Sequence, residues 1–347
     1  MFIRNAWYLA AWSDELGAAP LARRICNQPV VLYRDRQQGA VALEDRCCHR
    51  SAPLHLGRIV DAGLQCGYHG LVFDHTGRCV EIPAQVLIPD RARIRSYPVV
   101  EKDQLVWIWM GEADRADATK IIDYPYHDDR ANWPHRHTVM HIKASYLLSL
   151  DNLLDMTHAA YVHGNTVGGG DPMSFIQAKE ELTSRPDGLK LTRWLLDVDP
   201  PPTYVKAVGF KGRVDRWAEF NFVAPGSVLH WAGAVNVGQG AYENGNREGG
   251  FSIRTLNVLT PETEHSCFYF WSVAHGYRQD DPEATAQVFK AVAETFLEDK
   301  VMVEAQQLRL AEFGEAGLIG VANDRTRIQM RRTVDNLLAA EAQTTGT

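Results

Sequence analysis

Short runs of apolar residues, separated by turn residues, dominate the first third of the chain. Residues 30–33 (Val-Val-Leu-Tyr) and 40–43 (Ala-Val-Ala-Leu) are two such runs, and the turn between them, 35–39, begins with Asp and ends with Gly. This pattern predicts a β-hairpin. Residues 105–110 predict a buried strand that ends at Gly111. The first part of the chain is therefore predicted to be mostly strands and turns. Further strands are expected at 71–73 and 79–82.

The remaining two thirds mix strands with two helical regions. The stretch 112–120, charged and rich in small residues, separates the two patterns. We therefore expect an α+β protein with a first domain over 1–115 and a second over 116–347. In the second domain, strands are expected at 137–142, 190–196, 250–259 and 267–273, and helices near 147–158 and from 282 to about 310.

Composition and charge exclude several classes of protein. The 347 residues are 45% hydrophobic and 23% charged, which is typical of globular domains, and the formal net charge of -7 argues against a nucleic-acid partner. No apolar run is long enough to span a bilayer, and residues 1–17 carry too many polar residues for a secretory signal. Six cysteines in a chain of this length indicate a reducing cytosol, so we expect a cytoplasmic protein without a membrane partner.

Two short motifs supply the first candidate metal ligands. Cys47 and His49 form a Cys-x-His motif, and Cys66 and His69 form a Cys-x-x-His motif, with sixteen residues between His49 and Cys66. Two Cys on one iron and two His on the other is the ligand set of a Rieske [2Fe–2S] centre. Such a cluster transfers one electron at a time, so the rest of the chain should contain an electron acceptor.

Zinc is the alternative metal, since it also binds two Cys and two His. Zinc sites usually place the two Cys close together and the two His close together, whereas each motif here is mixed, and this favours the Rieske cluster. His55 and His75 lack a Cys at ligand spacing and are interpreted as ordinary loop residues. Cys48 and Cys79 are interpreted as free thiols that do not bind iron.

A second candidate metal site begins at residue 152. Asn152, Asp155 and His158 are spaced by three, so on a helix they would share one face, and His163 follows five residues later. Both imidazoles can reach one metal only if the helix ends or is distorted between them. Two His and one carboxylate make the facial triad of non-haem Fe(II) oxygenases. The alternative is an amphipathic helix with a polar outer face.

The chain resembles the oxygenase component of the Rieske non-haem iron aromatic-ring oxygenases. The resemblance covers nearly the whole chain and is greatest to the branch that contains vanillate O-demethylase, dicamba O-demethylase and toluenesulfonate methyl-monooxygenase. It implies that Asp299, on the later helix, is the carboxylate ligand of the mononuclear iron beside His158 and His163. The matching segments are the two Cys-His motifs, 152–163, 3–8, 259–264, 298–300 and 304–306.

The resemblance also implies an architecture and an assembly. An all-β Rieske domain would be followed by a helix-grip catalytic domain, in which an antiparallel sheet packs against a long helix. The two iron sites of one subunit would be far apart, so members of the family form a head-to-tail ring, typically a trimer. Asp155 would bridge His69 of one subunit and His158 of the next, which a carboxylate can do by orienting both imidazoles. Asn152 and Asp155 are therefore expected to act in catalysis.

The implied reaction uses O2 and two electrons to oxidise a small aromatic acid. The chain has no Gly-rich dinucleotide fingerprint, so a separate NADH-dependent reductase, with flavin and an iron-sulfur centre, or a ferredoxin would supply the electrons. We expect oxidative O-demethylation of a methoxylated aromatic of the vanillate type, with release of formaldehyde. The alternative oxygenase reaction is hydroxylation of an aryl methyl group, as on toluenesulfonate. A Rieske electron carrier without enzyme activity is a further alternative, but it leaves the second motif unexplained.

The sequence says least about the substrate. The resemblance to the dicamba enzyme places substrate-contacting positions near His230 and Asn257, which could hold a carboxylate, phenol or sulfonate. Both could equally be strand residues whose hydrogen bonds are satisfied within the core. A cluster of His135, His137 and His141 either lines the pocket entrance or forms a polar strand face. Residues 168–170, three glycines, form either a loop over the active site or a simple turn.

Overall fold

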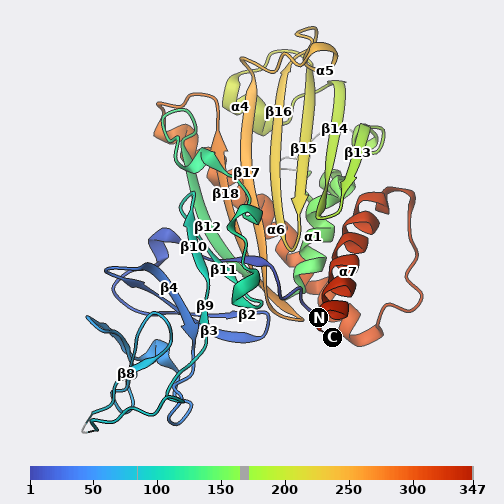
Figure 1. Cartoon of the computed structure of the whole chain (residues 1–347). Helices are drawn as coiled ribbons and strands as arrows, with labels where there is room; N and C mark the ends of the chain where they lie inside the picture. The colour runs from blue at the N-terminus through green and yellow to red at the C-terminus, as the bar shows by residue number, and fades with distance from the viewer. Residues whose placement is uncertain (84, 165–171, 346–347) are drawn as a thin grey trace. The chain divides into compact units, whose positions relative to one another are not determined.

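The computed structural model describes residues 1–83, 85–164 and 172–345 (Figure 1). The three glycines at 168–170, expected in a loop over the active site or a turn, lie outside the described residues. No helix in the described part of the chain is long and apolar enough to cross a membrane. The expected cytoplasmic location stays a prediction.

The chain divides into two compact units. Unit 1 comprises residues 1–123 together with 260–264, and unit 2 comprises 124–259 and 265–347. Unit 1 contains strands and short 3-10 turns, whereas unit 2 combines a large antiparallel sheet with helices. The predicted α+β fold, an all-β domain followed by an antiparallel sheet with a long helix, is confirmed.

The strands of unit 1 form small antiparallel sheets. The predicted hairpin is present: Val31 of β3 pairs with Leu43 of β4, and the carboxylate of Asp35 accepts hydrogen bonds from the backbone N–H groups of the turn. The sheet orders are β1-β11-β10, β2-β3-β4-β9 and β5-β6-β7-β8. The bounds are β1 (Trp7–Trp12), β2 (Leu21–Ile25), β3 (Gln28–Asp35), β4 (Gly39–Glu44), β5 (Arg58–Val60), β6 (Gly63–Gln65), β7 (Val72–Phe73), β8 (Cys79–Glu81), β9 (Ser96–Tyr97), β10 (Val99–Lys102) and β11 (Leu105–Trp109).

A seven-stranded antiparallel sheet is the framework of unit 2 in the described residues. Its order is β12-β18-β17-β16-β15-β14-β13, so neighbours in space are mostly neighbours in sequence. Only β12 lies beside a strand that is distant in the chain. The strands are β12 (His135–Ile142), β13 (Lys179–Arg185), β14 (Gly188–Val198), β15 (Val214–Val223), β16 (Ser227–Asn236), β17 (Phe251–Thr263) and β18 (Ser266–His275).

Helix α6 (Pro282–Phe313) packs against one side of this sheet. Asp281 caps its start by accepting a hydrogen bond from the N–H of Glu283, and Pro282 occupies the first turn. Aromatic side chains of α6 stack on the sheet: the ring centroids of Phe289, on α6, and Trp271, on β18, are 4.9 Å apart. The other helices are α1 (Tyr146–Leu154), α2 (Ala159–Val162), α3 (Pro172–Ile176), α4 (Pro202–Val208), α5 (Ala241–Asn244) and α7 (Arg325–Thr345). The 3-10 turns are η1 (Ser13–Glu15), η2 (Leu54–Leu56), η3 (Ala113–Arg115), η4 (Ala118–Lys120), η5 (Pro125–His127), η6 (Met156–His158) and η7 (Ala322–Asp324).

The C-terminal helix α7 is held to α1 by charge. The guanidinium of Arg331 donates two hydrogen bonds to Asp151, of 2.9 and 2.6 Å, and Arg327 lies 3.2 Å from the same carboxylate. Asp151 is only 8% exposed, so these ion pairs offset the cost of burying its charge. Because Asp151 directly precedes Asn152, the contact fixes the segment that leads to the second candidate metal site.

Gly233 lies at a closely packed point of the sheet. Gly233 of β16 lies opposite Trp217 of β15, and a Cβ atom at residue 233 would be 2.0 Å from the Trp217 ring. We expect Gly233→Ala to destabilise the protein by about 1–3 kcal/mol, because the buried Trp217 ring must move. Gly212→Ala is the control, since nothing lies within 4 Å of its Cβ position. Chemical denaturation measures both, and equal stability of the two variants would contradict this packing.

Candidate metal sites and the cavity beside one of them

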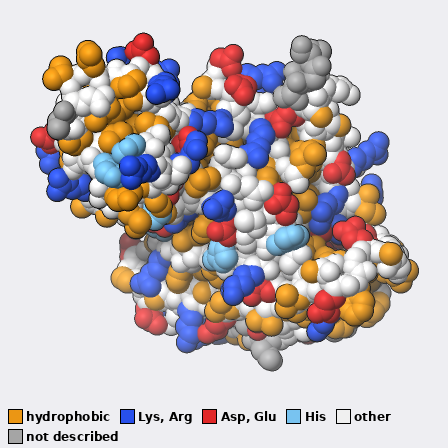
Figure 2. All heavy atoms as spheres, turned by 90° about the horizontal axis from the view of Figure 1, so that it is seen from below, with side chains coloured by type: hydrophobic (Ala, Val, Ile, Leu, Met, Phe, Trp, Pro, Cys, Tyr) orange, Lys and Arg blue, Asp and Glu red, His pale blue; other side chains and the backbone are white. Residues whose placement is uncertain are grey.

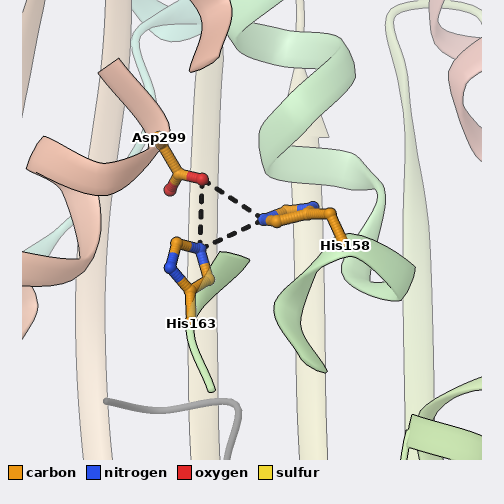
Figure 3. Close-up of side chains that lie close together, drawn as sticks. All are labelled: His158, His163 and Asp299. Carbon is orange, nitrogen blue, oxygen red and sulfur yellow. Dashed lines mark hydrogen bonds and ion pairs between the residues drawn. The ribbon is translucent and has the colours of Figure 1, made fainter. Parts of the chain in front are cut away.

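Three side chains of unit 2 converge on one point (Figure 3). The Nε2 atoms of His158 and His163 are 3.2 Å apart, and they lie 3.3 and 3.0 Å from Oδ1 of Asp299. His158 ends η6, His163 follows α2, and Asp299 comes from α6. Two imidazole nitrogens and one carboxylate oxygen are the donor set of a facial-triad iron site, and their positions fit a metal ion.

The local backbone explains how both imidazoles reach this point. Helix α1 ends at Leu154, and Asp155 has an extended backbone (φ -109°, ψ 103°). Its carboxylate accepts hydrogen bonds from the Thr157 N–H at 2.8 Å and the Thr157 hydroxyl at 2.6 Å, which starts η6. The expectation of one helical face through Asn152, Asp155 and His158 is therefore wrong. The expected helix end between the two histidines is confirmed, because α2 stops at Val162.

Two polar neighbours hold the converging side chains. Asn152 donates a hydrogen bond from Nδ2 to Asp299 Oδ1 at 2.9 Å. Glu298 Oε2 lies 2.8 Å from His163 Nδ1. A carboxylate can only accept, so Nδ1 carries a proton, and Nε2 is the nitrogen that faces His158 and Asp299. This role of Glu298 was not predicted. Its contact with His163 forms only when the chain folds, so the sequence holds no signal for it beyond the position of Glu298 next to Asp299.

The charges at this point favour an ionised carboxylate. Burial opposes ionisation of Asp299, but hydrogen bonds from His158 and His163 outweigh it and hold the pKa of Asp299 below its ordinary value. For His163, burial disfavours the charged form, but Asp299 and then Glu298 raise its pKa. The ionised carboxylate of Asp299 would attract a divalent cation to this point.

A cavity of about 360 Å³ adjoins the three side chains. Its walls come from the inner positions of β14 to β17, from α4 and from α6, and His158, His163 and Asp299 form part of the wall. Most of the lining surface is apolar, and polar and charged side chains form the rest. This composition is typical of sites for small organic ligands. The polar and basic lining residues on the sheet are Arg193, Arg216, His230, Thr255 and Asn257.

Both predicted substrate positions, His230 and Asn257, line this cavity. The His230 ring stacks on Phe220 with centroids 4.2 Å apart, and its Nδ1 lies 3.1 Å from the Thr255 hydroxyl. Burial, followed by the positive charge of Arg254, lowers the pKa of His230 to about 3, so the ring is neutral. Asn257 is buried among protein hydrogen-bond partners.

The cluster of three histidines lies elsewhere. His135, His137 and His141 are on β12, which pairs with β18, and none of them belongs to the described lining of the cavity. His135 is buried beside His127, with ring centroids 4.8 Å apart, whereas His141 is exposed. Of the two interpretations in the sequence analysis, the strand face agrees with this position.

In unit 1 the four Cys and His residues of the short motifs meet at the tips of two loops. Cys47 and Cys66 are each 2% exposed, and their side chains lie within hydrogen-bonding distance. The rings of His49 and His69 are exposed, with centroids 4.6 Å apart. Burial, above all, raises the pKa of the Cys47 thiol to about 11. Two buried thiols behind two exposed imidazoles match the donor set of a Rieske cluster.

Glycine permits the close approach of these loops. A Cβ at Gly67 would be 2.6 Å from the Leu56 carbonyl oxygen, and Gly70 has a left-handed backbone (φ +77°). Beneath them Leu54, Leu64 and Phe73 form a buried core with Cys47 and Cys66. Figure 2 shows that some of the histidine side chains at the protein surface lie among hydrophobic and basic side chains.

Comparison with known proteins identifies a family for each of the two parts of the chain. The Rieske [2Fe-2S] domain family matches residues 6–98, and the vanillate O-demethylase oxygenase C-terminal domain family matches residues 142–340. The exact division between the predicted domains, at 115/116, stays a prediction. The chain is 41% identical to the toluene-4-sulfonate monooxygenase system iron-sulfur subunit of Comamonas testosteroni, over 98% of each chain. It is 34% identical to the vanillate O-demethylase oxygenase subunit of a Pseudomonas species, over 99% of this chain and 97% of the other.

The fold is also similar to solved structures of dicamba monooxygenase. A crystal structure of dicamba monooxygenase bound to 3,6-dichlorosalicylic acid superposes with a TM-score of 0.91 at 34% identity, over 98% of this chain and 99% of that chain. Another, with non-heme iron and dicamba, has a TM-score of 0.80 at 31% identity and covers 99% of both chains.

The chain belongs to the Rieske non-haem iron oxygenases, as an oxygenase component of the branch that includes the vanillate and dicamba O-demethylases and toluenesulfonate monooxygenase. It is a monooxygenase component that carries a Rieske [2Fe–2S] domain and works with a separate electron donor and an aromatic substrate. The zinc and electron-carrier alternatives are thereby set aside.

The contact between Glu298 and His163 generates a prediction about metal affinity. Glu298→Ala removes the acceptor that orients His163, so we expect affinity for Fe(II) to fall by about 10–100-fold. Glu298→Gln keeps an acceptor without the charge and should lie between Glu298→Ala and the wild type. Glu312→Ala, at an exposed position of the same helix, is the matched control. Anaerobic Fe(II) titration after chelator treatment measures all three, and wild-type affinity in Glu298→Ala would contradict the orienting role.

Proposed function

We propose that this oxygenase oxidises the methyl carbon of a methoxy group on a small aromatic acid, releasing a phenol and formaldehyde. The observation that carries the proposal is the position of His158, His163 and Asp299 in the wall of a largely apolar cavity of about 360 Å³. A substrate carbon in this cavity would lie next to the converging donor atoms. The cavity walls exclude water around the reacting group.

In this proposal each chain uses two metal sites. Cys47, His49, Cys66 and His69 hold the [2Fe–2S] cluster, and His158, His163 and Asp299 hold a mononuclear Fe(II). The iron supplies the O2 chemistry when it is bound. Asn152 positions the Asp299 carboxylate, and Glu298 keeps the proton of His163 on Nδ1. These contacts support a mononuclear iron site because they keep the metal-donor atoms of His158, His163 and Asp299 facing one another.

A second candidate reaction is hydroxylation of an aryl methyl group. The 41% identity to the toluene-4-sulfonate monooxygenase subunit supports it, since the vanillate O-demethylase subunit is 34% identical. Both reactions oxidise a methyl carbon next to the same cavity. They differ in the product, because only the methoxy substrate releases formaldehyde.

Turnover with a panel of substrates tests the proposal. The purified protein with a flavin and iron-sulfur reductase, NADH and O2 should convert methoxybenzoates to phenols, with one formaldehyde for each product formed. Conversion of 4-toluenesulfonate to an alcohol without formaldehyde would favour the second candidate. His158→Ala should abolish both activities while the cluster stays reducible, because two protein donors are too few. Failure of every aromatic acid in the panel to be oxidised would contradict the proposal.

The proposed assembly is a head-to-tail trimer. Beside the exposed His49 and His69, unit 1 presents Leu56, 70% exposed, and Tyr68, 63% exposed. Near His163, unit 2 presents Tyr161, 71% exposed, and α6 carries exposed Leu297 and Val301. Large exposed apolar side chains around each metal site are suited to contact with another copy of the chain. Such a contact would bring the cluster of one subunit close to the iron of the next.

Asp155 is the proposed bridge in this contact. Its Oδ1 accepts both hydrogen bonds from Thr157, which leaves Oδ2 for His158 and for His69 of the next subunit. We expect Asp155→Asn to assemble both metal centres but to slow oxidation of the reduced cluster by about 10–100-fold, because the carboxylate no longer orients the two imidazoles. The exposed Asp335→Asn is the control. Rapid mixing of the pre-reduced protein with O2 and substrate measures the rate, and wild-type oxidation in Asp155→Asn would exclude the bridge.

A further inference from the structure

One polar side chain of the cavity wall has an unused hydrogen-bonding atom. Nε2 of His230 is buried and has no hydrogen-bond partner in the described part of the chain. His230 lines the same cavity as His158, His163 and Asp299. A buried polar atom without a partner is costly, and where such an atom faces a cavity it points to a ligand. Whether that ligand must accept or donate depends on which ring nitrogen carries the proton.

The hydrogen bonds behind His230 can be followed from the backbone. Asn257 lies opposite Val228 in the pairing of β16 with β17, and its amide is 3.1 Å from the Val228 carbonyl oxygen. A carbonyl oxygen only accepts, so the NH2 group of Asn257 must face Val228. The other end of the amide, Oδ1, accepts a 2.7 Å hydrogen bond from the hydroxyl of Tyr269. The orientation of the Asn257 side chain is therefore fixed at both ends.

The second N–H of the Asn257 side-chain amide extends this chain of hydrogen bonds toward His230. It donates to the Thr255 hydroxyl oxygen at 3.4 Å, and the same oxygen lies 3.1 Å from His230 Nδ1. In the described part of the chain the Thr255 hydroxyl contacts only these two groups, and the Asn257 NH2 group can only donate to it. Nδ1 is therefore the acceptor available to the hydroxyl proton. Nδ1 thus accepts, and in a neutral imidazole the proton must then be on Nε2. Cross-strand pairing of His230 with Thr255 keeps the two groups in register.

We infer that Tyr269, Asn257 and Thr255 form a relay that fixes His230 as a neutral Nε2–H donor in the cavity, selecting ligands with an acceptor-only oxygen such as an ionised carboxylate or sulfonate. Asn257 is then a positioning residue, because its amide is held by Val228, Thr255 and Tyr269. Of the two interpretations of Asn257 in the sequence, these contacts favour the residue whose hydrogen bonds are satisfied within the core. The inference rests on the proposed function only in taking this cavity as the substrate site.

The charge of the cavity wall supports an ionised oxygen. Basic residues outnumber acidic ones among the residues that line it, which favours an anion over a neutral hydroxyl group. A phenol or alcohol could also accept from Nε2–H, but its own proton would then need a second acceptor. The basic lining residues are Lys206, Arg193, Arg216, Arg278 and Lys290, and the acidic ones are Glu294 and Asp299.

The test measures binding rather than turnover. Thr255→Val keeps the shape of the side chain but removes the hydroxyl, and Thr255→Ser keeps the hydroxyl. We use the iron-loaded protein under argon, with 4-toluenesulfonate and 4-methoxybenzoate as acidic probes and 4-methylanisole as the neutral probe. Affinity for both acids should fall by about tenfold in Thr255→Val and by less than about twofold in Thr255→Ser. Affinity for the neutral probe should be unchanged in both variants.

A double-mutant cycle separates the relay from a general packing effect. If Thr255 acts through His230, then Thr255→Val should cost no further affinity for the acids in a His230→Leu background. Additive losses, equal losses for the neutral probe, or the absence of acid binding by the wild-type protein would overturn the inference. If the acids bind as expected but are not oxidised when reductase and O2 are supplied, the proposed function fails and the relay stands.

Discussion

The placement of helix α6 against the sheet is the constraint on which the metal site and the cavity both depend. Aromatic contacts such as that of Phe296 with Tyr269 hold one side of this helix to β18. On the same helix, Glu304 and Gln307 accept hydrogen bonds from the backbone N–H groups of Lys143 and Ser145, just before α1 begins. These contacts set the distance between α1 and α6. Asn152 can therefore reach Asp299, although 146 residues separate them in the chain.

The same contacts bury polar side chains of α6 in the interior of the protein. Burying Asp299 is unfavourable on its own, and the two imidazoles with Asn152 compensate for it. A metal ion would satisfy these donors more completely than their own hydrogen bonds do. In the cavity next to them, His230 remains neutral because burial disfavours a charged ring and Nδ1 accepts a hydrogen bond from the Thr255 hydroxyl. The same cavity wall therefore holds a charged carboxylate, Asp299, at the metal site and a neutral imidazole, His230, at the proposed ligand contact.

Sequence reasoning was most successful where residue type and spacing were sufficient. Cys47, His49, Cys66 and His69 carry their chemistry in two short motifs, and the hairpin around residues 35–39 is a local pattern. Asp299 is different, since it lies on a helix among other acids and was identified by resemblance alone. The role of the neighbouring Glu298 could not be predicted without the fold, because its contact with His163 joins residues 135 positions apart.

The elements that sequence analysis missed also have physical reasons. β15 and β16 were not expected, since Arg216 and His230 are inward-facing polar residues and disturb the alternation of a buried strand. β13 is almost wholly exposed, so it lacks an apolar face. The polar helix α7 was not expected either, because its attachment through Arg331 and Asp151 is a long-range ion pair with no local signal.

The central claim is that one chain holds two different iron centres, one of them in the wall of the cavity. Metal and sulfide analysis of the anaerobically purified protein tests this claim most directly. The account predicts three iron atoms and two inorganic sulfides per chain, with a chelator removing one iron while the EPR signal of the reduced Rieske cluster persists. Two iron atoms that are both resistant to the chelator, or zinc in place of the labile iron with full activity, would contradict it.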